Sequence, residues 1–431
     1  MTDHTHDPRA TSWVAEANDH AEFPVQNLPL GIFSPRGSDD ARGGVAIGDR
    51  ILCLRGAADL MDGAAAQAAR LADAGALNAL FAQGNAAAEA LRLGLFALLT
   101  DESRAAAAEK ALFDAGECTL HMPFRVGDYT DFYTGIQHAT NVGRQFRPDN
   151  PLLDNYKYVP IGYHGRASSL RVSGAPVTRP AGQTRSSGGK PPYFKPSARL
   201  DYEMEMAIWT GGENPLGTPV PIGEAAARVA GLSILNDWSA RDIQAWEYQP
   251  LGPFLAKNFL TTVSPWLVTS AALAPFRTAQ PARAEGDPRP LAYLWDEADQ
   301  QRGAYAVFME VRLSSAQMRA RGMAPHRLSR GPMTAMYWTA AQLVAHHTVN
   351  GCNLLPGDLL GTGTLSGMEP SSYGSLLELS EGGKRPIALP SGENRTFLED
   401  GDEIVMTAHG EAAGARTIGF GECRGRVVAA R

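Results

Sequence analysis

Residues 236–248 read NDWSARDIQAWEY and follow the apolar run VAGLSIL at 229–235. An apolar run that ends in asparagine and aspartate predicts a buried strand followed by a helix, with Asp237 as the N-cap residue. Four polar side chains would share one side of that helix, because residues three and four positions apart are neighbours on a helix surface. They are Asp237, Arg241, Gln244 and Tyr248. Bulky apolar residues occupy the positions between them, so the stripe indicates a buried polar cluster rather than a solvated helix face.

The composition is that of a globular protein with more than one domain. The chain has 431 residues, of which 44% are hydrophobic and 20% are charged, so it can fill two cores. A net charge of −7 and the absence of a block rich in lysine and arginine argue against nucleic acid as a partner. No run approaches the roughly 18 apolar residues that span a bilayer, and the N-terminus, MTDHTHDP, is polar. We therefore expect no membrane partner and a soluble, cytoplasmic protein.

The cysteines and histidines lack the spacing of a disulfide framework or a zinc site. The four cysteines, at positions 53, 118, 352 and 423, lie far apart without CxxC spacing. The ten histidines complete no set of cysteine and histidine ligands. We therefore expect reduced cysteines, as in a reducing compartment.

The chain changes character near residue 122. Before it, a hairpin with a Gly48-Asp49 turn precedes a stretch at 57–112 that is rich in alanine and leucine with helical spacing. No acid, base and nucleophile candidates cluster there, which predicts a small α+β unit with a structural role. After it, short strand-like runs alternate with glycine, proline and serine turns, as is typical of a largely antiparallel β architecture. We expect the chemistry in this second part.

A further pair of acids lies on a predicted strand. In residues 202–209, YEMEMAIW, strict alternation points Glu203 and Glu205 to one face. A solvent-facing edge strand is the alternative, but the apolar run that follows indicates a strand buried on both faces. Buried paired carboxylates need a cation, and a hard divalent ion is the simplest one. With Asp131 and Asp237 they would form an all-oxygen set that suits Mg²⁺ or Ca²⁺ better than Zn²⁺.

Other segments carry isolated candidates. Because no histidine is needed as a ligand, His138 would be available as a base, with a hydrogen-bonded core histidine as the alternative. Lys257 stands alone in an apolar run, where it would need an anionic partner. Residues 361–367, GTGTLSG, match neither a P-loop nor a dinucleotide fingerprint and indicate a loop whose backbone approaches a small substrate. We interpret the histidine pair in the helical run 336–349 as structural.

Several of these segments together resemble the fumarylacetoacetate hydrolase family. The resemblance runs through DYTDFY at 128–133, QHATNVG at 137–143, GYHGRASS at 162–169, YEMEM at 202–206, NDWSARDIQ at 236–244 and HHTVNGCN at 346–353. It spans essentially the whole chain. The resemblance implies an α+β fold that is mainly β, with an N-terminal SH3-like β-barrel domain at 1–122. A C-terminal β-roll domain of the family's own type, at 123–431, would house the site and form a homodimer.

The resemblance also implies roles for individual residues. The metal ligands fall on the four carboxylates already selected, which are Asp131, Glu203, Glu205 and Asp237. A lysine and a threonine would contact the metal through water, and these fall on Lys257 and Thr261. The general base falls on His138, oriented by Glu378. Arg241, Gln244 and Lys257 would steady the carbanion-like leaving group. Substrate contacts fall on Tyr133, Arg147, Gln244, Tyr248 and Thr364.

The implied reaction is the hydrolysis of the carbon–carbon bond of 4-fumarylacetoacetate, a small β-diketo acid, to fumarate and acetoacetate, the last step of tyrosine and phenylalanine degradation. Mg²⁺, Ca²⁺ or both would be the cofactor. An oxaloacetate-decarboxylase-like or acylpyruvate-hydrolase-like member is the alternative with the same fold, and the chain length and the GYHGRASS segment argue against it. A non-catalytic protein on a degenerate hydrolase fold is the alternative from another class. The base, the lysine and the acids are all present, which argues against it.

Overall fold

The computed structural model describes residues 2–186 and 190–431. Its N-terminal part is built on a five-stranded antiparallel sheet. Its strands run in the order β4 (Leu112–Asp114), β3 (Arg50–Cys53), β2 (Arg42–Ile47), β1 (Leu30–Pro35) and β5 (Cys118–His121). The predicted hairpin is confirmed as β2 and β3, and Gly48 in its turn has a φ of 56°. Glycine reaches this left-handed conformation without the strain that a side chain would bring.

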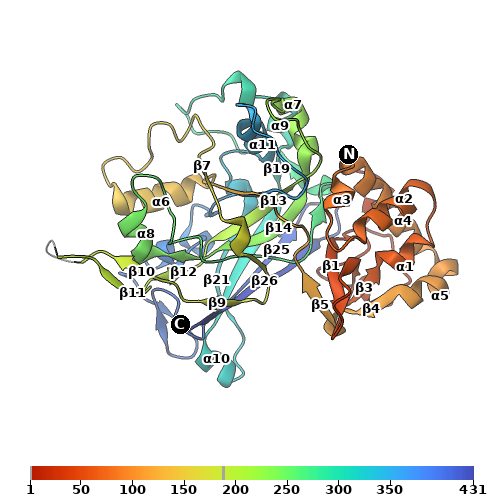
Figure 1. The fold of residues 1–431 in the computed structure, drawn as a ribbon, viewed down its shortest axis with the longest axis horizontal. Coiled ribbons are helices and arrows are strands. Elements are labelled where there is room, and N and C mark those ends of the chain that lie inside the picture. The colour runs from red at the N-terminus through yellow and green to blue at the C-terminus, as the bar shows by residue number, and fades with distance from the viewer. Residues whose placement is uncertain (1, 187–189) are drawn as a thin grey trace.

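Short helices pack against this sheet, on the right of the molecule in Figure 1. They are α1 (Leu54–Ala58), α2 (Gly63–Ala72), α3 (Asn78–Phe81), α4 (Asn85–Thr100) and α5 (Ala105–Ala108). In α4, Leu91, Leu95 and Leu98 are buried at three- and four-residue spacing, so one face of the helix joins the domain core. The predicted helical character of 57–112 is therefore confirmed.

Two larger sheets form the C-terminal part. The first has eight strands: β6 (Tyr129–Phe132), β7 (Gly162–His164), β8 (Leu170–Val172), β13 (Met204–Thr210), β14 (Val229–Asp237), β16 (Thr261–Val263), β17 (Val268–Thr269) and β22 (Leu359–Gly361). The second runs in the order β21 (His326–Pro332), β20 (Val307–Ser314), β25 (Glu403–Gly410), β26 (Ile418–Val428) and β9 (Pro176–Thr178). Most neighbours are antiparallel, as the turn-rich sequence predicts, and the fold is mixed but mainly β.

Smaller elements connect and flank these sheets. The remaining helices are α6 (Ile136–Phe146), α7 (Ile222–Ala225), α8 (Arg241–Glu247), α9 (Glu297–Arg302), α10 (Ala316–Ala320), α11 (Ala340–Thr348) and α12 (Leu376–Leu379). The short strands are β10 (Ala181–Thr184), β11 (Tyr193–Pro196), β12 (Leu200–Asp201), β15 (Ser239–Ala240), β18 (Arg277–Thr278), β19 (Ala304–Tyr305), β23 (Ile387–Ala388) and β24 (Asn394–Arg395). Across residues 2–186 and 190–431, no helix combines the length and the apolar character needed to cross a bilayer.

Strand β13 has a different core on each face. Every residue of the strand is buried, so the predicted burial of both faces is confirmed. Met206 and Ile208 join the core between the two large sheets. Ala207 and Trp209, on the other face, join the core of the N-terminal domain, where the Trp209 ring stacks on Phe124 with centroids 4.7 Å apart. Because side chains alternate along a strand, Glu205 lies on the same face as Ala207 and Trp209.

The junction after β14 differs from the prediction. Asp237 is the last residue of the strand, not a helix N-cap, because its backbone pairs with Thr261 of β16. Ser239 and Ala240 then form β15, which pairs with β12, and only at Arg241 does α8 begin. The predicted polar stripe therefore does not lie on one helix. Asp237 lies in the sheet, whereas Arg241 and Gln244 lie on α8.

A second boundary also differs. The helical run predicted for 336–349 begins later, because Thr339 caps α11 in a reciprocal pair of hydrogen bonds with Gln342. Its two histidines bond to neighbouring hydroxyl groups: His346 Nδ1 lies 3.0 Å from Tyr293 and His347 Nε2 lies 2.9 Å from Thr130.

Candidate metal-dependent active site

Three buried carboxylates converge across the first large sheet. Asp131 of β6, Glu205 of β13 and Asp237 of β14 each offer an oxygen within 4.8 Å of the others. β22 runs between β6 and β13, and its Gly361 is paired with Asp131. A Cβ atom at Gly361 would lie 2.6 Å from Asp131 Oδ1 and 3.2 Å from Glu205 Oε2. Glycine at this position therefore leaves the space in which the two carboxylates meet.

The fourth predicted carboxylate, Glu203, lies next to this group but is bound by cations. Its Oε1 accepts a hydrogen bond from Arg241 Nη1 at 2.7 Å, and its Oε2 accepts one from Lys257 Nζ at 2.5 Å. Lys257 Nζ also lies 2.7 Å from Asp237 Oδ2, and the Thr261 hydroxyl donates to Asp237 Oδ1 at 2.6 Å. The structure thus brings together all four predicted carboxylates, the lysine and the threonine.

The charge on these carboxylates is only partly balanced. Burial, reinforced by the charge of Asp237, raises the pKa of Asp131 to about 8. Burial and the neighbouring acids also raise the pKa of Glu205 far above its ordinary value, and burial raises the pKa of Asp237. Glu203 differs: although burial opposes its ionisation, Lys257 and Arg241 hold the pKa of this carboxyl well below its usual range. Among the described residues, Asp131 and Glu205 have no cation beside them, whereas Asp237 is paired with Lys257.

The donor set fits a hard divalent cation. Among the described residues, Asp131 Oδ1 and Glu205 Oε1 are buried without a hydrogen-bond partner. Buried polar atoms without partners are costly, and a cation would satisfy both oxygens at once. All the candidate ligand atoms are oxygens, the type that Mg²⁺ and Ca²⁺ prefer. The triad of Asp131, Glu205 and Asp237 thus has the chemistry of a divalent metal site.

A histidine and a glutamate form a buried pair next to this group. His138 on α6 places Nδ1 2.7 Å from Glu378 Oε2 on α12. Glu378 also accepts hydrogen bonds from the side chains of Asn141, Ser366 and Ser375. His138 and these donors hold the pKa of Glu378 below its ordinary value, although burial opposes this. A carboxylate at Nδ1 favours the tautomer with a proton there, which leaves the Nε2 lone pair as a base.

Helix α8 contributes a guanidinium group. Arg241 Nη1 donates to Gln244 Oε1 at 3.1 Å as well as to Glu203, so the helical spacing of the two residues brings them together as predicted. Within the described part of the chain, Arg241 Nη2 is buried without a partner. Tyr248 is the C-cap residue of the same helix. The unpartnered N–H group can donate to a bound anion.

Two of the residues expected to contact substrate are Tyr133, which lies beside His138, and Thr364, which lies in the glycine-rich loop. The Tyr133 ring stands edge-on to His138, with centroids 5.7 Å apart, and the Tyr156 hydroxyl donates to the Tyr133 carbonyl oxygen. The Thr364 hydroxyl is buried without a partner among the residues described. Its neighbour Gly363 donates its backbone N–H to Glu205 Oε2 at 2.9 Å, so the glycine-rich loop approaches the carboxylate group.

Arg147, also expected at the substrate, lies at the C-terminal end of α6. Its Nη2 donates to the Pro151 carbonyl oxygen at 3.3 Å. Burial raises the pKa of Tyr133, and the positive charges of Arg241 and Arg147 oppose this rise.

Two residues at the site were not predicted from the sequence. The Tyr163 hydroxyl on β7 donates to Asp237 Oδ2 at 3.3 Å, and the Asp201 carboxylate accepts from Arg241 Nε at 2.9 Å. Tyr163 stands within GYHGRASS, so the density of polar residues in that segment was an available signal. Asp201 directly precedes YEMEM, and strict alternation places it on the same face as Glu203 and Glu205, so this spacing was also an available signal.

Comparisons with known proteins match both parts of the chain. The family described as fumarylacetoacetate (FAA) hydrolase C-terminal matches residues 129–428, and the family described as fumarylacetoacetase N-terminal matches residues 26–123. Fumarylacetoacetase from Rattus norvegicus is 45% identical over 427 residues, which cover 97% of this chain and 99% of that protein. Fumarylacetoacetase from Caenorhabditis elegans is 46% identical over 420 residues, which cover 95% of this chain and 97% of that protein.

A solved structure shares the fold. The fumarylacetoacetate hydrolase from psychrophilic Exiguobacterium antarcticum has a TM-score of 0.51 at 16% identity, covering 94% of this chain and 100% of that chain. At this identity the likeness concerns the fold alone.

Proposed function

Because this chain belongs to the fumarylacetoacetate hydrolase family, we propose that its buried site hydrolyses the carbon–carbon bond of 4-fumarylacetoacetate to fumarate and acetoacetate. This is fumarylacetoacetase activity, the last step of tyrosine and phenylalanine degradation. One observation within the structure carries the proposal. A histidine–glutamate pair that can activate water lies beside a carboxylate triad, a lysine and an arginine that can hold a β-diketone and balance its negative charge.

The metal would be Mg²⁺ or Ca²⁺, held by Asp131, Glu205 and Asp237, with Glu203 as the fourth ligand. Lys257 and Thr261, both bonded to Asp237, would contact the ion through water. When bound there, a divalent cation supplies positive charge that polarises the oxygens of the β-diketone. The oxygen-only donor set supports this choice of ions.

His138 acts as the general base in this proposal. Glu378 holds the proton on Nδ1, so Nε2 removes a proton from water as the water oxygen bonds to the carbonyl carbon beside the fumaryl group. The carbon–carbon bond then breaks, and its electron pair departs with the acetoacetate carbon as an enolate. The proton held on His138 returns to that carbon. Fumarate and acetoacetate therefore contain all the atoms of substrate and water.

The cationic side chains stabilise the negative charge that develops. Arg241 and Lys257 are fixed by Glu203, and Gln244 is fixed by Arg241, so these donors need no rearrangement as the reaction proceeds. Arg241 Nη2, which has no partner among the described residues, is the N–H group we assign to the leaving enolate.

Four further residues would bind the substrate itself: Tyr133, Arg147, Tyr248 and Thr364. Tyr133 contacts the base, and the Thr364 hydroxyl is buried without a partner in the described part of the chain. Arg147 offers a positive charge near Tyr133 for a substrate carboxylate. Gln244 would add an amide contact from α8.

Family membership supports a finer description of fold and assembly as well. The N-terminal sheet would close as an SH3-like β-barrel within residues 1–122, and the two large sheets at 123–431 would be the family's β-roll. The β-roll would also form a homodimer. A cytoplasmic location is supported by the four cysteines, all of which are free in the structure.

The test is the loss of ultraviolet absorbance of enzymatically generated fumarylacetoacetate, with product analysis, before and after EDTA and with Mg²⁺ or Ca²⁺ added back. We expect metal-dependent turnover to fumarate and acetoacetate. His138→Ala should lower kcat by about a hundredfold or more while metal binding remains. His346→Ala is the matched control, because the hydrogen-bond partner of this histidine among the described residues is Tyr293, outside the site, and the variant should keep near-normal turnover. Faster turnover of oxaloacetate or an acylpyruvate than of fumarylacetoacetate would contradict the proposal.

A further inference from the structure

We propose that Asp201 is a positioning residue that joins Arg241 and the His138–Glu378 pair into one rigid unit, an inference that rests on the function proposed above. Asp201 ends β12, which pairs with β15 so that Asp201 lies opposite Ser239. Arg241 follows β15 directly. The Asp201 side chain is completely buried. Its carboxylate therefore lies between the start of α8 and the interior of the domain.

One oxygen of Asp201 sets the orientation of the guanidinium group. Oδ2 accepts from Arg241 Nε at 2.9 Å, while Glu203 Oε1 accepts from Arg241 Nη1 at 2.7 Å. The two carboxylates hold the guanidinium group at different nitrogens. Arg241 Nη2 is the nitrogen that remains, buried and without a partner among the residues described. Asp201 thus determines which N–H group is presented to the leaving group.

The same carboxylate holds the helix that carries Glu378. Oδ1 accepts from the backbone N–H of Leu376 at 2.8 Å, and Oδ2 accepts from that of Leu377 at 3.0 Å. These are the first two amides of α12, which a helix leaves without partners inside the helix. Glu378 follows immediately and bonds to His138. One buried side chain therefore contacts the arginine and the support of the base.

A role in stability alone explains this arrangement less well. Glu203 already pairs with Arg241, and a second completely buried carboxylate adds a desolvation cost. Arg395 and Asp402, which lie outside the site, provide a comparison. Both oxygens of Asp402 bind that guanidinium group, at 2.8 and 3.1 Å. Asp402 also accepts from one backbone N–H group, that of Glu399. Asp201 instead gives Arg241 one hydrogen bond and accepts from two successive backbone N–H groups of α12.

The test is Asp201→Asn in a double-mutant cycle with Arg241→Lys, measured as kcat and KM for fumarylacetoacetate. The asparagine amide group would face two donors and lacks the charge that holds the guanidinium group. We expect kcat to fall by about 10- to 100-fold with KM changed by less than about threefold, because an interaction made in the transition state is lost. In the Arg241→Lys background the same substitution should cost clearly less than in the wild type, since residues that act through one another are not additive, and the cost that remains reports the support of α12.

Asp402→Asn is the matched control, a buried aspartate that is paired with arginine outside the site. It should lower Tm as much as Asp201→Asn does and leave kcat unchanged. If Asp201→Asn lowers kcat no more than Asp402→Asn, or if the effects of Asp201→Asn and Arg241→Lys multiply, the inference is overturned.

A second variant covers the case in which Asp201→Asn does not fold. Asp201→Glu keeps the charge but moves the carboxylate by one methylene group, and it should also lower kcat with little change in KM. Wild-type kcat in this variant would overturn the inference. Turnover by the wild-type enzyme in the same assay separates the two proposals. If the wild-type enzyme does not turn over fumarylacetoacetate, the proposed function and the inference are overturned together. If it does, but the effects of Asp201→Asn and Arg241→Lys multiply, the inference alone is overturned.

Discussion

The two halves of the buried site place carboxylates in opposite surroundings. In the cationic half, Asp201 and Glu203 bind Arg241, and Glu203 also binds Lys257. In the acidic half, defined by Asp131, Glu205 and Asp237, the carboxylates mainly face one another, and their pKa values are raised by burial. The pKa of Glu203 is instead lowered by its cations, against the effect of burial. The cationic half is therefore complete as the chain folds, and the acidic half has the donor set to accept a cation from solution.

This difference predicts opposite responses to neutralising a carboxylate on β13 or directly before it. Glu205→Gln removes a candidate ligand from the acidic half, so activity with Mg²⁺ should fall by about a thousandfold or more. The metal-free protein should nevertheless become more stable, by about 1–2 kcal/mol, because repulsion between buried carboxylates is relieved. Initial rates and urea denaturation in EDTA measure the two effects. The matched variant Glu203→Gln should destabilise the protein instead, and equal signs for the two variants would contradict the comparison.

Removing a cation from the cationic half should cause the largest decrease in the free energy of unfolding. Lys257→Met leaves Glu203 without one of its two cations and Asp237 without its only ion-pair partner among the described residues. Removing one member of a buried ion pair costs about 3–5 kcal/mol, because the other charge stays buried. Urea denaturation of the metal-free protein measures this cost. Lys257→Arg keeps the charge and serves as the control. If the methionine variant unfolds at the same urea concentration as the wild type, Lys257 does not stabilise the carboxylates of the cationic half, and the comparison fails.

The acidic half should also make the stability of the metal-free protein depend on pH. The pKa of Asp131 is raised to about 8 by burial, then by Asp237, whereas an unfolded aspartate titrates near 4. The unfolded chain then binds fewer protons than the folded one between these values, so folding weakens as pH rises from about 4 to 8. We expect a loss of about 1–3 kcal/mol in EDTA. Thermal unfolding across this range should be flatter for Asp131→Asn, and a wild-type profile as flat as that of the variant would argue against the raised pKa.

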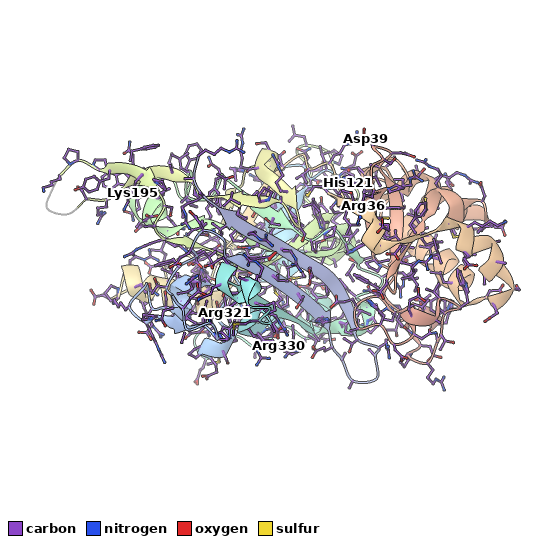
Figure 2. The ribbon with its side chains drawn as sticks, turned by 90° about the horizontal axis from the view of Figure 1, so that it is seen from below. Arg36, Asp39, His121, Lys195, Arg321 and Arg330 are labelled. Carbon is purple, nitrogen blue, oxygen red and sulfur yellow. The ribbon has the colours of Figure 1, made fainter. Side chains whose placement is uncertain are left out.

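A surface ion pair should show the smallest effect. Arg330, labelled in Figure 2, places Nη2 2.6 Å from Glu411 Oε1, and both side chains are about 40% exposed. Exposed pairs contribute about 1 kcal/mol or less, since water and salt screen them. Arg330→Ala should therefore change the free energy of unfolding by less than that amount and leave kcat unchanged. A loss as large as that of Lys257→Met would mean that burial does not separate the two kinds of ion pair.

The part of the site that depends on local pattern was predictable from the sequence. Alternation in YEMEM places Glu203 and Glu205 on one face, and spacing on α8 places Arg241 beside Gln244. The difference between the two glutamates was not predictable, because it depends on Lys257, which lies 54 residues further along the chain. Only the folded chain shows which carboxylate receives the cation.

The N-cap prediction for Asp237 fails for a related reason. An aspartate after an apolar run has the same local pattern whether it ends a strand or begins a helix. Pairing of its backbone with Thr261 decides the outcome, and that pairing depends on a distant strand. Alternation places Asp201 on the face of Glu203, but its partners come from α8 and α12, far away in the sequence, so its role was not predictable.

Strand β13 also affects how freely the two domains of this protein could be separated. Its Glu205 face continues through Ala207 and Trp209 into the core of the N-terminal domain, where Leu30 forms a β-bridge to Leu267 of the C-terminal part. A gene that encoded residues 123–431 alone would leave this apolar surface, tryptophan included, exposed to water at the far end of the catalytic strand. The two domains are thus poor candidates for modular exchange, because they share one apolar core through the strand that carries Glu205.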